Sequence, residues 1–188
     1  MTAHVRTSSS LHFVEPRARV IKHPGPLNAQ RIQSRSAAFA RHFRLSLGPG
    51  TTLADAVIVP LLQIGVRSAS MTVLGGQFAE LHYCLAPPDP THQAVIAYTR
   101  PRNLGAALMI FGNATLATLP DGKAVVHCHA AVGASDGVHG GHIVPHLSIV
   151  GTEPISVLVT AWTGFELSVR FDSETNIPLI QPTPEVLP

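Results

Sequence analysis

Short alternating apolar segments, separated by turn-forming residues, fill most of the chain after residue 68. Successive side chains on a strand point to opposite faces, so this alternation predicts half-buried β-strands. The expected strands, with one more before residue 68, are 42–47, 68–74, 78–85, 94–99, one or two over 104–119, 124–134, 143–150, 155–162 and 165–171. Pro120-Asp121-Gly122-Lys123 and Ser135-Asp136-Gly137 are typical of hairpin turns, whereas Gly140-Gly141 predicts a break.

One segment has helical periodicity instead. Thr51 or Thr52 can cap a helix, Pro60 should kink or divide it, and Gly65 should end it. The apolar residues expected on its buried face are Leu53, Ala56, Val57, Leu61 and Ile64. One helix among many strands predicts an α+β fold, a mainly antiparallel β-sheet with one or two flanking helices.

The composition limits the class of protein. The 188 residues suffice for one domain with a real core, and the mean hydropathy is +0.24. Charged residues make up 13%, against about 25% in ordinary soluble domains. This excludes wholesale disorder and indicates that part of the surface is buried in an oligomer.

The net charge of +2 conceals a basic N-terminus and an acidic remainder. The first 44 residues hold eight basic side chains and one acid, whereas the remainder holds five basic and ten acidic ones. We therefore divide the chain into a basic arm (1–40), a folded domain (41–172) and a Pro-rich tail (173–188) that is expected to be extended and irregular. The arm is either a solvated extension or a nucleic-acid-contacting segment. Its candidate phosphate contacts are Arg17, Arg19, Lys22, Arg31 and Arg35.

No secretory or membrane segment is evident. The first 20 residues lack the apolar core of a signal peptide, and the longest apolar run, 56–66, is about half a membrane span. We therefore expect a cytoplasmic protein that does not enter a membrane. Cys84 and Cys128 are then expected to be buried, reduced thiols.

Three of the eleven histidines form the most informative pattern. His127 and His129 lie two residues apart on a predicted strand, so they share a face about 6.6–7 Å apart at Cα. The Asp136-Gly137 turn can return the chain antiparallel and bring His142 against them. Three imidazoles suit a divalent metal such as Zn²⁺, Ni²⁺, Co²⁺ or Fe²⁺ and leave a coordination position open. The alternative is a set of polar side chains that hydrogen-bond across the sheet or line a subunit interface.

A second polar pair lies on another predicted strand. Glu80 and His82 share a face and could supply a general base or an extra ligand, with Glu80 as the base. An exposed polar strand face is the simpler interpretation. The chain contains no nucleophile elbow, Walker loop, Gly-x-Gly-x-x-Gly or His-Glu-x-x-His sequence, so whether it is an enzyme stays open.

Four segments resemble the PPC domain, also called the PCC or plants and prokaryotes conserved domain. Gly48-Pro49-Gly50 resembles its Leu-x-Pro-Gly opening before a helix, and Leu108–Asn113 resembles its apolar strand ending in Gly-Asn. His127–Ala130 resembles its His-Leu-His-Ala strand, and Asp136–Ile143 its Gly-Gly-His turn. The resemblance covers about residues 41–172, and the last two motifs are the specific part.

The resemblance implies an antiparallel sheet with a flanking helix, assembled as a homotrimer. Plant members carry AT-hooks and bind DNA, and stand-alone prokaryotic members are often assigned to DNA binding without an established activity. This chain has no Arg-Gly-Arg-Pro hook, and Ala106 replaces the acid expected before the apolar strand. All three histidines of the prokaryotic pattern are present, which favours the metal site.

Three functions follow. The first is a trimeric DNA-binding or regulatory module with a three-histidine metal site, for which zinc is the expected metal. The second is a metal-dependent enzyme or small-molecule binder at the subunit clefts. The third is a plain trimeric scaffold. The weakly acidic body and the 5% aromatic content weaken the DNA hypothesis, whereas the arm supports it.

Overall fold

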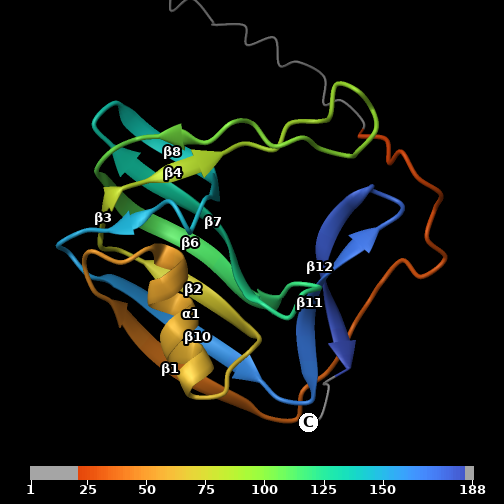
Figure 1. The fold of residues 1–188 in the computed structure, drawn as a ribbon, viewed down its shortest axis with the longest axis horizontal. Coiled ribbons are helices and arrows are strands. Elements are labelled where there is room, and N and C mark those ends of the chain that lie inside the picture. The colour runs from red at the N-terminus through yellow and green to blue at the C-terminus, as the bar shows by residue number, and fades with distance from the viewer. Residues whose placement is uncertain (1–20, 185–188) are drawn as a thin grey trace, which may run out of the picture.

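The fold is a mainly antiparallel β-sheet with one α-helix, as a computed structural model describes it for residues 21–184 (Figure 1). The helix α1 spans Leu53–Gln63. The strands are β1 Ala40–Leu47, β2 Ala69–Leu74, β3 Gln77–Glu80, β4 His82–Cys84, β5 Arg102–Asn103, β6 Ala107–Thr118, β7 Ala124–Ala134, β8 Gly137–Ile143, β9 Ile149–Val150, β10 Ile155–Trp162, β11 Phe165–Asp172 and β12 Ile177–Pro184.

The sheet follows the order β1-β10-β2-β6-β7-β8-β4-β5, and every neighbouring pair in it is antiparallel. β3 and β9 pair beside this path, and the β11–β12 hairpin joins it through one parallel bridge between Ser168 and Thr118. Two long strands, β6 and β7, therefore form the centre of the sheet. The predicted α+β class is confirmed.

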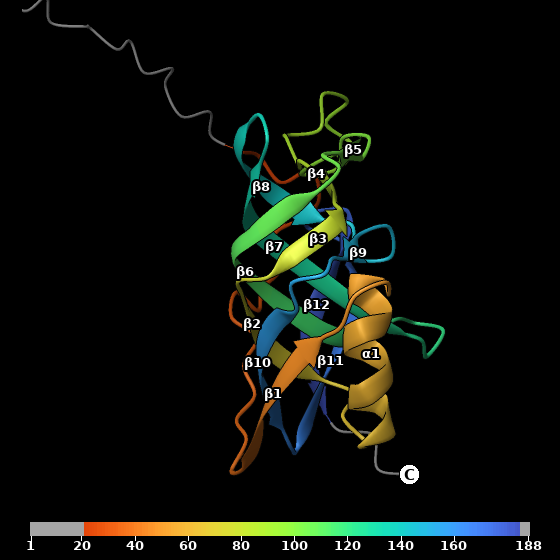
Figure 2. The same cartoon turned by 90° about the vertical axis from the view of Figure 1, so that its left-hand side faces the viewer.

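The helix covers one face of the sheet (Figure 2). Thr52 caps it, because its side chain accepts a hydrogen bond from the Asp55 amide. Gly65, at φ +75°, ends it as predicted. The Gly65 amide donates to the Leu62 carbonyl, and the Val66 amide donates to the Leu61 carbonyl. Leu53, Val57 and Leu61 are buried.

The helix differs from the expectation at Ile64, which is exposed rather than on the buried face. Pro60 lies inside the helix and does not divide it. Ile64 is the C-cap, with φ −99° and ψ 14°, so it has already left the helical path that would carry its side chain inward.

The core lies between the helix and the sheet. Phe78, Leu116 and Ile155 are fully buried there, and Cys128 points inward from β7. Both cysteines are free and buried, as predicted. Since alternate residues of β7 face the core, His127 and His129 lie on the opposite face of the sheet, away from α1.

The strands 124–134 and 155–162 occur as predicted, but three other segments differ. Residues 78–85 are split at Leu81 into β3 and β4, and 143–150 turns between the end of β8 and β9 instead of forming one strand. Residues 94–99 form a loop with a single bridge, at Ile96. β6 is one continuous strand, one of the two alternatives expected for 104–119, and its register shifts between Met109 and Phe111.

Residues 177–184 of the Pro-rich tail are extended, as predicted, but they are not irregular: they form β12, which pairs with β11. Pro178, Pro182 and Pro184 are separated by even numbers of residues, so their main-chain nitrogens point to the same side of β12. All three prolines can therefore occupy positions that donate no hydrogen bond to β11. Within residues 21–184, β12 pairs only with β11, which gives it the edge position that proline tolerates.

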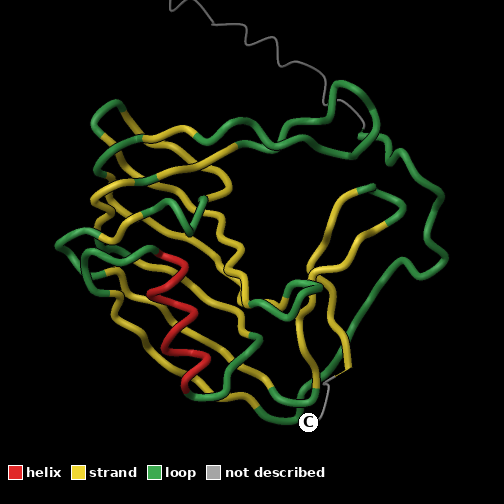
Figure 3. The backbone as a smooth tube through the Cα atoms, viewed as in Figure 1, coloured by secondary structure: helices red, strands yellow, loops and turns green. Residues whose placement is uncertain are grey.

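Residues 21–39 form no helix or strand and run along the outside of the β11–β12 turn (Figure 3). The loop between β4 and β5 reaches the same place, where the Val95 amide bonds the Thr175 carbonyl. Among residues 21–184, no helix is long and apolar enough to cross a membrane.

Candidate metal centre

The three histidines come from the β7–β8 hairpin. Its two-residue turn, Ser135-Asp136, pairs Ala134 with Gly137 and thereby sets His129 directly opposite His142. His127 lies two residues before His129 on the same strand and therefore shares its face. The local sequence thus places all three imidazoles together on the face of the sheet away from the core.

The imidazoles converge closely. One ligand nitrogen from each of His127, His129 and His142 lies within 4.8 Å of the others. The His142 Nδ1 and His129 Nε2 atoms are 3.4 Å apart. A tetrahedral zinc ion with Zn–N bonds of about 2.0–2.1 Å needs ligand nitrogens about 3.3–3.4 Å apart. The cluster could therefore hold a single metal ion: the His129–His142 separation is already at the required value, and separations as wide as 4.8 Å would have to close toward it.

The glycines before His142 are part of the strand. β8 runs unbroken from Gly137 to Ile143, so the expected break at Gly140-Gly141 is wrong. Gly141 is needed for a close approach instead: a Cβ at this position would lie 2.7 Å from the Cys84 carbonyl oxygen of β4. The missing side chain lets β4 pack tightly against the strand that carries His142.

The electrostatics favour neutral imidazoles. Burial lowers the pKa of His127, and the neighbouring His129 lowers it further. Burial also lowers the pKa of His142 to about 4, with added contributions from His127 and His129. A cationic form of His127 or His142 would have no compensating acid within the cluster, so these two rings stay unprotonated at neutral pH. The unprotonated nitrogen is the form that binds a metal.

Tyr98 belongs to the surroundings of the site and was not expected from the sequence. Its ring centroid lies 5.0 Å from that of His142, with the planes at 44°. Tyr98 comes from the loop between β4 and β5, within the segment 94–99 whose alternation predicts a strand. No local pattern predicts this approach, because the loop is positioned by contacts with the distant β11–β12 turn.

Glu80 and His82 bind each other. The Glu80 Oε1 atom is 2.8 Å from His82 Nε2 and accepts a 2.6 Å hydrogen bond from Asn103 Nδ2. The His82 partner contributes most to lowering the pKa of Glu80. Its carboxylate is not among the clustered ligand atoms of the three histidines. The role of Glu80 as a general base stays a prediction.

The basic arm is only partly described. Arg17 and Arg19 lie outside residues 21–184, whereas Lys22 and Arg35 are exposed. Arg31 instead contacts Glu174, whose carboxylate also accepts a 2.8 Å bond from the Asn28 amide.

Glu174 holds the arm against the β11–β12 turn. Its Oε1 atom is 2.6 Å from His23 Nδ1, and its side chain is only 6% exposed. The Arg31 guanidinium, the Asn28 amide and His23, in that order, hold the pKa of Glu174 at about 2. One of the five candidate phosphate contacts is therefore engaged within the protein.

A family model matches most of this domain. The Plants and Prokaryotes Conserved (PCC) domain matches residues 34–161. The match contains the helix, the β7–β8 hairpin and all three clustered histidines. No curated protein sequence matches the chain.

Several solved structures share the fold at low sequence identity. A metal-containing protein from Archaeoglobus fulgidus is 17% identical, with a TM-score of 0.62 over 80% of this chain and 98% of that one. A protein from Ralstonia eutropha JMP134 whose name suggests DNA binding is 19% identical, with a TM-score of 0.57 over 74% and 88%. A Pyrococcus horikoshii plant- and prokaryote-conserved protein is 17% identical, with a TM-score of 0.58 over 81% and 95%.

Proposed function

The chain belongs to the Plants and Prokaryotes Conserved domain family, and we propose that it is a member that binds one divalent metal ion. The observation that carries the proposal is the convergence of His127, His129 and His142 within 4.8 Å on one face of the sheet. The metal content stated for the Archaeoglobus fulgidus protein supports it. Three neutral nitrogen ligands favour zinc over the oxygen-preferring Mg²⁺ and Ca²⁺.

The protein would supply three of the four ligands of a tetrahedral ion. The fourth position would then be open to water or to a small molecule. A zinc ion held in this way polarises a bound ligand and lowers the pKa of bound water. The histidines themselves hold the ion in place, and the rigid β7–β8 ladder keeps their spacing fixed.

Metal analysis of tag-free protein tests this proposal. We expect about one zinc per chain in the wild type and in His146→Ala, an exposed histidine outside the cluster. His129→Ala and His142→Ala should each lose most of the metal, with unchanged circular dichroism. Equal metal content in the wild type and in His129→Ala would overturn the proposal.

We further propose that the chain assembles as a homotrimer. Leu74 on β2 and Phe111 on β6 lie opposite each other on the sheet face that carries the histidines, and both are exposed. Leu158 on β10 shares this face and is exposed as well. An apolar sheet face of this kind is stabilised when another subunit covers it.

Light scattering distinguishes the oligomer from a monomer. The wild type and Val59→Glu, a change on the exposed side of α1, should give the mass of three chains. Phe111→Glu should dissociate at micromolar concentrations, because it places a charge within the covered face. A wild type that is monomeric at every concentration would contradict the proposal.

A second candidate function is DNA binding, which the name of the Ralstonia eutropha protein favours. Three arms on one trimer would combine weak phosphate contacts through avidity. Replacing Arg17, Arg19, Lys22 and Arg35 with alanine should remove salt-sensitive retardation of a DNA duplex in a gel. Absence of retardation by the wild type at low salt would rule DNA binding out.

A further inference from the structure

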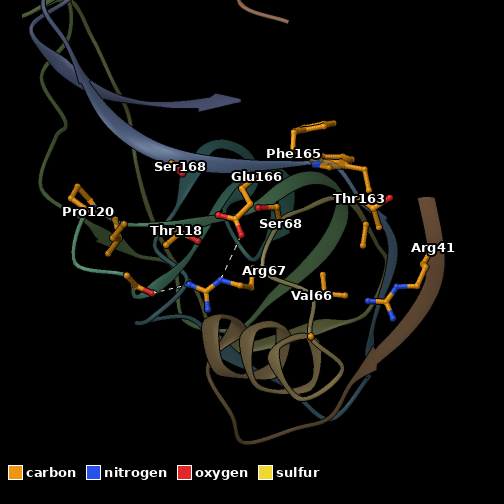
Figure 4. Close-up of a pocket in the computed structure, with 15 residues that line it drawn as sticks. Arg41, Val66, Arg67, Ser68, Thr118, Pro120, Thr163, Phe165, Glu166 and Ser168 are labelled. Atoms are coloured by element: carbon orange, nitrogen blue, oxygen red, sulfur yellow. Dashed lines mark hydrogen bonds and ion pairs between the residues drawn. The ribbon is translucent and has the colours of Figure 1, made fainter. Parts of the chain in front are cut away.

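A cavity of about 680 Å³ lies apart from the histidines (Figure 4). Four parts of the chain line it: β1, the loop after α1, the β6–β7 turn, and the β10–β11 turn with its flanking residues. Its volume lies within the range of about 300–1,000 Å³ typical of small-molecule sites. None of the three clustered histidines lines it, so its ligand would be independent of the proposed metal.

One wall of the cavity is aromatic. The rings of Trp162 and Phe165 stack with centroids 5.0 Å apart and planes inclined by only 12°. This pair presents a flat surface to which another planar ring can add. The indole Nε1 of Trp162 is buried and has no hydrogen-bond partner among residues 21–184. Buried donors are nearly always paired, so this N–H calls for an acceptor from water or from a ligand.

Two guanidinium groups face the cavity from different walls, with Arg41 on β1 and Arg67 after α1 (Figure 4). Arg67 makes only long contacts: its Nε lies 3.9 Å from Glu166 Oε1, and its Nη2 donates to the Gly122 carbonyl at 3.4 Å. Arg41 donates to the Ile64 carbonyl at 3.2 Å. A guanidinium carries five N–H donors, so both side chains keep donors for a ligand.

The charged groups of the cavity are two arginines and one acid, Glu166, which leaves a positive excess. A positive excess, a flat aromatic wall and an unpaired indole N–H together select one kind of ligand. We propose that this cavity binds a small planar anion, a ring that carries a carboxylate or a phosphate. The ring stacks on the Trp162–Phe165 pair, and Arg67 and Arg41 receive the anionic group, because guanidinium matches both oxyanions.

Trp162 is the only tryptophan of the chain, so its fluorescence reports on this cavity directly. The probes are benzoate and phenyl phosphate, titrated against the full-length protein with excitation at the tryptophan edge. At least one of them should give a saturable change in Trp162 emission. Cyclohexanecarboxylate lacks the planar ring and benzyl alcohol lacks the charge, so each should bind at least about tenfold more weakly. The relative affinities of benzoate and phenyl phosphate identify the preferred oxyanion.

Matched arginine variants test the site. Arg67→Ala should weaken binding by about tenfold or more, since it removes a charge-assisted contact. Arg44→Ala removes the same charge from β1, where Arg44 bonds Ser156 outside the cavity, and should bind like the wild type. His129→Ala should also leave binding unchanged. The proposal would be overturned if benzoate and phenyl phosphate both failed to give a saturable change. It would also be overturned if Arg67→Ala and Arg44→Ala weakened binding equally.

Discussion

Gly141 provides a demanding test of how the histidine cluster is built. In Gly141→Ala, the new Cβ would lie 2.7 Å from the Cys84 carbonyl oxygen and 3.0 Å from Tyr83 Cδ2. Carbon–oxygen contacts between strands are normally about 3.3–3.6 Å. The clash with a backbone atom cannot be relieved by rotating a side chain, so β4 and β8 must move apart by about 0.6–0.9 Å, the deficit from that contact distance.

This displacement has two measurable effects. Overpacking of this kind costs about 1–3 kcal/mol of the free energy of unfolding. For a chain of this length each kcal/mol lowers Tm by about 2–4 °C, so the expected loss is about 2–12 °C. Because His142 follows Gly141 directly, zinc affinity should also fall by about 10–100-fold, the usual effect of disturbing the support of a metal ligand.

The assay compares Gly141→Ala with Gly140→Ala. A Cβ at Gly140 would lie 3.5 Å from the Ala130 carbonyl oxygen, an ordinary contact, so this variant should behave like the wild type. Thermal unfolding of metal-free protein measures the packing cost, and competition with a chromophoric chelator measures zinc affinity. If both variants matched the wild type in Tm and affinity, the close approach of β4 and β8 would not be what positions His142.

Three further predictions concern the site, the arm and the helix. The metal-free protein should lose stability as the pH falls from about 6.5 to about 4, because the unfolded chain takes up protons on His127 and His142 before the folded chain does. In urea unfolding, the free energy of unfolding of His142→Gln should depend less steeply on pH than that of the wild type. Glu174→Ala should speed tryptic cleavage after Arg31, since the arm loses its bonds to the β11–β12 turn, whereas Glu153→Ala, an exposed acid, should not; equal rates in all three proteins would contradict the role of Glu174. Thr52→Ala should lower the free energy of unfolding by about 1 kcal/mol through loss of the helix cap, and Thr52→Ser should restore it, as chemical denaturation would measure.

The histidine cluster could be predicted because every step of the inference is local. The period of a strand places His127 and His129 on one face. The Ser135-Asp136 turn then fixes the register, which carries His142 opposite His129. Bringing the three histidines to one face therefore needs no contact with a distant part of the chain. The close approach of β4 at Gly141, which further constrains His142, is long-range and was not part of that inference.

The β12 strand could not be predicted by the same reasoning. Several prolines in a short segment argue against a strand when the segment is considered alone. The structure accommodates them because β12 is an edge strand and its three prolines lie an even number of residues apart, so that their nitrogens point to the same side of the strand. Edge position is a property of the whole sheet, so composition gave the wrong answer.

The prediction of a strand at 94–99 was wrong for the opposite reason. Its alternating apolar residues fit a strand, but the main-chain donors of Val95 and Ala97 bond loop carbonyls of Thr175 and Pro87 instead of a neighbouring strand. Periodicity reports which side chains are apolar and says nothing about the partner that a strand needs. Tyr98 reaches His142 only as a consequence of these long-range contacts.

The interpretation of the charge of the arm also depends on contacts with a distant part of the chain. By count, the arm is a run of free cations beside an acidic body. In the structure Glu174, 143 residues later in the chain, binds Arg31 and thereby removes one of those cations from any competition for phosphate. A nucleic acid that used Arg31 would first have to separate it from a carboxylate with a pKa of about 2, which remains ionised at every physiological pH. Any contribution of the described arm to DNA binding therefore falls mainly on Lys22 and Arg35, which no acid in residues 21–184 engages.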